Sequence, residues 1–196
     1  MSASLLPLRL PHGEDDIVCV GSGVRPPALL PGSFNPSHAA HWSLAAVAAR
    51  LLGVPVAFEL SLHNVDKPDL TSGDVERRVQ QFAGKADLWL TRAPTFVHKA
   101  RLFPGTIFVV GADTAARLVA QRYYVDAAAH RQAIRTLADL GCRFLVAARS
   151  DAAGRLQTLE DLAVPQEWRP LFDGIDPREF RMDISSTQLR SRASAI

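Results

Sequence analysis

The sequence of 196 residues contains only 2 cysteines and no marked excess of charge of either sign. Cys19 and Cys142 lie far apart in apolar runs, so we expect two buried thiols rather than a disulfide or a metal pair, as suits a reducing cytoplasm. Lys and Arg number 22 against 20 Asp and Glu, which gives a net charge of +2. So small a surplus gives little support to nucleic-acid binding, and we expect no nucleic-acid partner.

Long hydrophobic runs are also lacking. The longest apolar region, residues 44–60, is interrupted by Arg50, Gly53 and Pro55, so we expect no membrane partner. The first residues do not have the basic start and apolar stretch of a signal peptide. With 47% hydrophobic residues the chain can bury a sizeable core. We expect one domain over residues 28–196, preceded by an N-terminal arm over residues 1–27 with one short strand.

Short apolar runs alternate with helical patterns after the arm. In the segments between the runs, Val75, Val79 and Phe82 fall on one helical stripe, and Asp126 and Gly141 are suited to begin and end the last helix. This alternation predicts an α/β fold, with a Rossmann-like parallel sheet of about five or six strands and helices on both faces. Ligands bind at the carboxyl ends of such strands. The apolar runs are residues 28–31, 55–61, 87–91, 106–110 and 143–148.

The first candidate site is the segment GSFNPSHAAH at residues 32–41, directly after the first run. Gly32 permits a tight turn, and the free N–H groups of the helix that follows attract anions. His38 and His41 are three apart, so on a helix both imidazoles lie on one face of its first turn. The segment therefore suits a bound phosphate, although a pair of ordinary surface or core histidines has the same spacing. No third metal ligand stands nearby, so we expect no metal site.

The second candidate is ISSTQLR at residues 184–190. Its consecutive hydroxyls, on Ser185, Ser186 and Thr187, suit a helix start or phosphate oxygens, and Arg190 one turn further adds a forked donor. An ordinary capped C-terminal helix is the alternative.

Together the two segments resemble the paired signatures G-x-F-[DN]-P-x-H-x-G-H and I-S-S-T-x-[IV]-R of the nucleotidylyltransferase superfamily. Within it the chain is most similar to nicotinamide or nicotinate mononucleotide adenylyltransferases and to an uncharacterised adenylyltransferase-like branch. The resemblance covers about residues 28–192 and includes Asp66, Lys67, Arg77, Arg78 and the GAD at 111–113.

The resemblance implies transfer of AMP from ATP, with magnesium, to a mononucleotide, with release of pyrophosphate. It assigns catalytic roles on the triphosphate to His38, His41, Lys67 and Arg190. It assigns nucleotide contacts to Gly32, Ser33, Phe34, Gly111, Asp113, Ser185, Ser186 and Thr187. For the acceptor it points to Phe96 and Lys99, although Phe96 is equally suited to a place in the core.

Two departures from the family pattern bear on activity. Ala40 stands where the superfamily has Gly, and an added methyl there affects close approach to the nucleotide. The turn Thr95, Phe96, Val97 lacks the third-position hydroxyl of nicotinate-specific enzymes, which leaves the acceptor open. Alternatives are therefore a nucleotidylyltransferase that uses CTP, or one that takes a phosphorylated pantetheine or polyol, or a non-catalytic nucleotide sensor. The sequence also leaves a homo-oligomer open.

Overall fold

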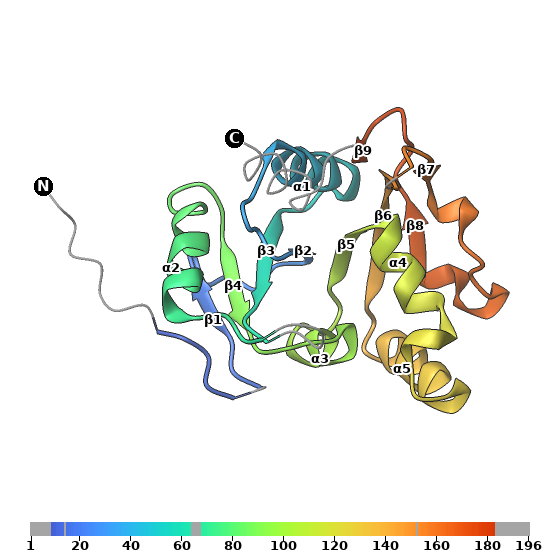
Figure 1. The fold of residues 1–196 in the computed structure, drawn as a ribbon, viewed down its shortest axis with the longest axis horizontal. Coiled ribbons are helices and arrows are strands. Elements are labelled where there is room, and N and C mark those ends of the chain that lie inside the picture. The colour runs from blue at the N-terminus through green and yellow to red at the C-terminus, as the bar shows by residue number, and fades with distance from the viewer. Residues whose placement is uncertain (1–8, 14, 64–67, 152, 183–196) are drawn as a thin grey trace, which may run out of the picture.

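The computed structural model describes residues 9–13, 15–63, 68–151 and 153–182. Among these residues, nine strands form a sheet in which β1 (Val18–Val20), β4 (Leu88–Thr91), β3 (Val56–Ser61), β2 (Ala28–Pro31), β5 (Ile107–Gly111) and β6 (Arg143–Ser150) follow one another. The five strands from β4 to β6 are parallel. Figure 1 shows this sheet with its flanking helices. The predicted α/β, Rossmann-like fold is confirmed.

Alternate residues along the strands enter two separate cores. One core joins Leu30, Phe58 and Leu60 of the sheet to α1 (Ala39–Leu52) and α2 (Ser72–Gln80). The other joins Leu29 and Phe108 to α3 (Phe96–Leu102), α4 (Ala112–Val119) and α5 (Ala127–Asp139). Strands that are buried on both faces require near-continuous apolar sequence, which explains the runs in the sequence.

Helix boundaries follow the expected local chemistry. The Asp126 carboxylate accepts a hydrogen bond from the Ala129 N–H at 2.7 Å and so caps α5. Gly141, with a φ of 68°, turns the chain just past the end of that helix, a backbone conformation that costs glycine little. Val75 and Val79 of α2 and Phe82 just beyond it are all buried, as their spacing predicts. None of the helices in the described ranges has the length and hydropathy that a membrane span needs.

The arm is not separate from the sheet. Its strand β1 pairs antiparallel with β4, with Val18 opposite Leu90 and Val20 opposite Leu88, and so forms the outermost strand on that side. Beyond β6 the structure adds elements that the sequence patterns did not reveal. They are β7 (Leu156–Gln157), β8 (Phe172–Gly174), β9 (Arg181–Met182) and two 3-10 turns, at Leu159–Asp161 and Gln166–Leu171. A further 3-10 turn, at Gln121–Tyr123, lies between α4 and α5.

Candidate functional site: the carboxyl ends of β2, β5 and β6

The order of the parallel strands defines where a ligand fits. The chain proceeds outward from β2 to β3 and β4 on one side, then returns to β5 and β6 on the other. β2 and β5 pair only at Ala28 with Ile107 and at Leu29 with Phe108, although both strands continue beyond these residues. Ligands of doubly wound sheets bind at this reversal point, outside the carboxyl ends of the strands. The loop after β2 and the start of α4 both lie at this edge.

The loop after β2 is built around a buried ring. Phe34 is fully buried and has a φ of 44°, which is uncommon for a residue with a side chain. A methyl group on Gly32 would lie 2.6 Å from two atoms of this ring, so only glycine fits there. The ring in turn packs edge-on against His41, with centroids 5.1 Å apart. The buried Phe34 ring thus packs against His41, a candidate site residue, and does not present its own face to a ligand.

Two side chains of the α2 region hold the same loop by its backbone. Arg78 Nη1 donates to the Ser33 carbonyl at 2.9 Å, and Gln81 Nε2 donates to the Phe34 carbonyl at 3.1 Å. Gln81 Oε1 also accepts from the N–H of Ser37, at 2.7 Å, and from its hydroxyl, at 2.9 Å. The shape of the loop is therefore fixed by contacts within the protein, which is the condition for a preorganised site.

His38 and His41 lie together at the start of α1. Their rings stack with centroids 3.8 Å apart and 29° between the planes. The His38 N–H donates to His41 Nδ1 at 3.2 Å, so neutral His41 carries its proton on Nε2 and keeps a donor there. His38 Nδ1 is buried and has no hydrogen-bond partner among the described residues. The spacing argument correctly placed both rings on one face of the first turn.

Both imidazoles favour the neutral form. Burial, then the charge of His38 and of Arg149, lowers the pKa of His41 to about 4. Burial and Arg149 also lower the pKa of His38. At neutral pH the two rings are therefore uncharged, and they can stack without mutual repulsion. An anion bound between them and Arg149 would favour the charged forms and raise both pKa values.

The opposite side of the site comes from β5 and β6. Gly111 ends β5 and precedes α4, and Asp113 lies in the first turn of that helix. Arg149 Nη1, near the end of β6, lies 3.2 Å from Asp113 Oδ1. A methyl group on Gly111 would come within 2.6 Å of that same oxygen and 3.5 Å of Arg149 Cδ. A methyl group on Gly111 would therefore displace the Asp113 carboxylate, whereas the backbone itself, with a φ of −80°, is open to any residue.

Sequence reasoning missed Arg149 and Gln81. Arg149 directly follows the apolar run at 143–148, so the rule that placed ligands after the earlier strands would have found it had it been applied to this strand as well. Gln81 acts on backbone groups 44 and 47 residues away in the sequence, and no local pattern reports such a contact.

Several predicted residues lie outside the described ranges: Lys67, Ser185, Ser186, Thr187 and Arg190. The described part of the chain ends at Met182, which pairs with Arg149 in the β6–β9 ladder. The ISSTQLR segment begins two residues later in the sequence, at Ile184. Its predicted role on the phosphates stays a prediction.

The two residues expected to bind the acceptor have other contacts. Phe96 packs edge-on against Phe108 and Phe144, with centroids 5.3 Å from each, and adjoins the core on that face. Lys99 is buried, and its ammonium donates to both carboxylate oxygens of Glu59 and to the Ala93 carbonyl. These contacts use all three donors of the ammonium, so Lys99 does not present a charge to a ligand in this conformation.

No group of three or more His, Cys, Asp or Glu side chains that could hold a metal ion occurs in the part of the chain that the structure describes.

A doubly wound parallel sheet thus carries paired imidazoles, a guanidinium and a carboxylate at its reversal point. A family model described as Cytidylyltransferase-like matches residues 29–192. The chain belongs to this family, and it is a nucleotidylyltransferase by that membership. No curated protein matches the chain.

Proposed function

We propose that the protein transfers AMP from MgATP to a mononucleotide, nicotinamide or nicotinate mononucleotide, and releases pyrophosphate. One observation carries this proposal: the sheet order brings the ends of β2, β5 and β6 together, so that the His38–His41 pair and Arg149 lie within electrostatic reach of one another. A polyphosphate between them would receive neutral N–H donors from one side and a guanidinium from the other.

The reaction requires positioning rather than a protein nucleophile. A phosphate oxygen of the acceptor forms a bond to the α-phosphorus of ATP, and the bond from that phosphorus to the pyrophosphate oxygen breaks. Two anions must be held in line, and the leaving group gains negative charge as it departs. We assign that charge to the His41 Nε2–H and to Arg149. We assign the ribose to Gly111 and Asp113, as the resemblance implies.

The acceptor belongs beside the turn that follows β4. β4 is parallel to β3 and β2, so its carboxyl end lies at the same sheet edge as the histidine loop. The turn at residues 92–95 leads from β4 into α3 and is therefore suited to contact a second substrate. The base of that substrate would be recognised by this turn, and its phosphate would point toward the nucleotide.

A direct assay tests the proposal. Purified protein is incubated with MgATP and each mononucleotide in turn, and pyrophosphate and the dinucleotide are measured. We expect stoichiometric formation of both with at least one of the two mononucleotides. Absence of product with both would overturn the assignment of acceptor.

The choice between ATP and CTP is tested separately, because the matching family model is described as Cytidylyltransferase-like. In a thermal-unfolding panel, a nucleotide at a hundred times its dissociation constant adds about 2.7 kcal/mol of stability. We expect this stabilisation with MgATP and not with MgCTP. The reverse result would favour a cytidylyltransferase with a phosphorylated pantetheine or polyol as acceptor, and stabilisation by ATP without turnover would favour a sensor.

A further inference from the structure

A buried polar cluster lies at the carboxyl ends of β3 and β4, apart from the phosphate site. Its centre is an ion pair between Glu59 of β3 and Lys99 of α3, whose side chains are only 1% and 8% exposed. Lys99 Nζ lies 2.7 Å from each oxygen of the Glu59 carboxylate. Thr91, the last residue of β4, donates its hydroxyl to Glu59 Oε1 at 2.6 Å.

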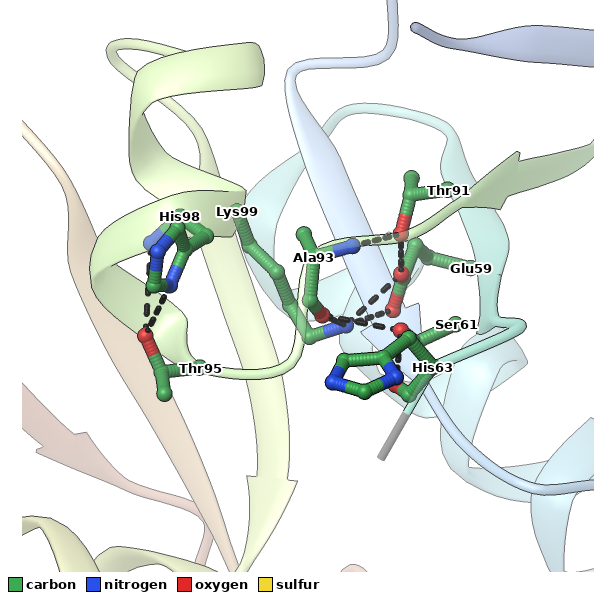
Figure 2. Close-up of polar contacts among 8 residues, drawn as sticks. All are labelled: Glu59, Ser61, His63, Thr91, Ala93, Thr95, His98 and Lys99. Atoms are coloured by element: carbon green, nitrogen blue, oxygen red, sulfur yellow. Dashed lines mark hydrogen bonds and ion pairs between the residues drawn. The ribbon is translucent and has the colours of Figure 1, made fainter. Parts of the chain in front are cut away.

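The cluster converges on the backbone of one residue, Ala93. Its N–H donates to Thr91 Oγ1 at 3.1 Å, and its carbonyl accepts from Lys99 Nζ at 3.0 Å. Ser61 Oγ lies 2.9 Å from the same carbonyl and 2.6 Å from the His63 carbonyl, so its one hydrogen is shared between the two. Figure 2 shows these contacts, with Ala93 between the Thr91 and Lys99 side chains. The N–H and the carbonyl of Ala93, which belong to the peptide groups before and after its Cα, are thus both held by side chains from β3, β4 and α3.

Stability alone does not explain such an arrangement. A buried ion pair loses its hydration, and well-packed apolar side chains of similar volume hold two elements together at least as well. What apolar side chains do not provide is a fixed direction for a carbonyl and an N–H group. A fully satisfied polar network does provide it, because each bond restricts the others.

The geometry points to Glu59 and Lys99 as positioning residues: they fix the backbone of Ala93, and with it the turn of residues 92–95, in the shape that binds the acceptor. This inference rests on the proposed function, which places the acceptor at that turn. Neither side chain touches the substrate, and both act through Ala93. Acceptor binding should therefore depend on the cluster, whereas ATP binding should not.

The sharpest variant is Thr91→Val, which keeps the shape of the side chain and removes the hydroxyl that joins Ala93 to Glu59. Its matched control is Thr106→Val. Thr106 is also buried, but it precedes the amino end of β5, and its hydroxyl donates to the Pro26 carbonyl at a long 3.4 Å. The same chemical change is thus made at opposite edges of the sheet.

Steady-state kinetics separates positioning from general destabilisation. We expect Thr91→Val to raise the KM of the acceptor about tenfold, the value of one lost hydrogen bond, with the KM of ATP unchanged. Ser61→Ala, which removes the hydroxyl shared between the Ala93 and His63 carbonyls, should act in the same direction. Thr106→Val should change neither KM. Equal increases in both KM values for Thr91→Val would overturn the inference.

Hydrogen exchange provides a readout that does not depend on turnover. We expect Thr91→Val to speed exchange of the Ala93 amide about tenfold, with the amides inside β4 unchanged. An unchanged rate at Ala93 would overturn the inference on its own. If the unmodified protein makes no product with either mononucleotide, the proposed function fails, and the exchange comparison still decides whether the cluster holds the turn.

Discussion

Arg149 Nη1 lies 3.2 Å from Asp113 Oδ1, so a side chain from β6 and a side chain from the first turn of α4 meet at the reversal point of the sheet. The charge of Arg149 also lowers the pKa values of His38 and His41, which come from the other side of that point. One guanidinium therefore acts on the residues expected to bind the ribose and on those expected to bind the phosphates.

Removal of this guanidinium should change the histidines directly. In Arg149→Met we expect the pKa values of both His38 and His41 to rise, because a nearby positive charge no longer opposes the imidazolium forms. Titration of the imidazole resonances by NMR measures this. Arg117→Met, whose guanidinium lies over the Tyr123 ring, is the control and should leave both values unchanged. A fall in either pKa value in Arg149→Met would contradict the electrostatic assignment.

The buried imidazole of His41 should make stability depend on pH. Its pKa is lowered from 6.5 to about 4 in the folded protein, so between these values the unfolded chain binds the extra proton. Stability contributed by the neutral ring is present above pH 6.5 and is lost as the pH falls toward 4. The shift in the pKa of His41 corresponds to a loss of at most about 3 kcal/mol in the free energy of unfolding.

Urea unfolding of the unmodified protein and of His41→Gln across this pH range checks the prediction. Glutamine at the third position of a helix can accept the same hydrogen bond from the His38 N–H, so the start of α1 is kept. We expect the variant to lose less stability than the unmodified protein as the pH falls. Parallel pH profiles for the two proteins would show that His41 is not held neutral.

Gly111→Ala tests the tight packing beside Asp113. The added methyl would lie 2.6 Å from Asp113 Oδ1, so the carboxylate must move away from Arg149. We expect ATP affinity, measured by calorimetry, to fall about tenfold, as for one lost hydrogen bond. Gly73→Ala is the control, because its methyl would meet only Arg77 Nη1, at 3.9 Å. Unchanged affinity in Gly111→Ala would remove Asp113 from the proposed nucleotide contacts.

How far the sequence predicts this molecule depends on how local each feature is. The strands from β2 to β6 are buried on both faces, so their apolar runs stand out and their boundaries were predicted to within about two residues. The His38–His41 spacing is also local, since one helical turn decides it. β8 and β9 are short and have no such run, and they exist because β6 offers them a partner.

The polar clusters depend on pairing that periodicity does not reveal. Glu59 is a carboxylate within an otherwise apolar strand, where none is expected. Its partner Lys99 can be identified only once the packing of α3 against β3 is known. The sequence analysis assigned Lys99 to the acceptor because the contact between Lys99 and Glu59 is not visible in the sequence. Phe96 shows the same difficulty, because an aromatic residue in a loop suits a ligand or a core equally well.

The Glu59–Lys99 pair should show the asymmetry of buried charges in unfolding experiments. In Lys99→Met the carboxylate stays buried without its cation, and we expect a loss of about 3–5 kcal/mol in the free energy of unfolding. In the double variant Glu59→Leu with Lys99→Met no buried charge is left, and most of this loss should be recovered. Urea denaturation of the three proteins measures it. A double variant no more stable than Lys99→Met would show that the charge itself is not the source of the loss.

The strongest test of the site is His41→Gln in the adenylyl-transfer assay. Glutamine preserves the hydrogen bond at the helix start. With its oxygen held there, however, it aims its amide N–H in a different direction from the imidazole Nε2–H, and it cannot become cationic as the pyrophosphate gains charge. Loss of one aimed donor costs about 3 kcal/mol of barrier, so we expect kcat to fall on the order of a hundredfold with the unfolding midpoint at pH 7 nearly unchanged. His12→Gln, a change at an exposed position near the start of the described chain, should leave kcat as it is. If His41→Gln turns over at the rate of the unmodified protein, the imidazole serves the loop and Phe34 alone, and the phosphates must be held by other residues.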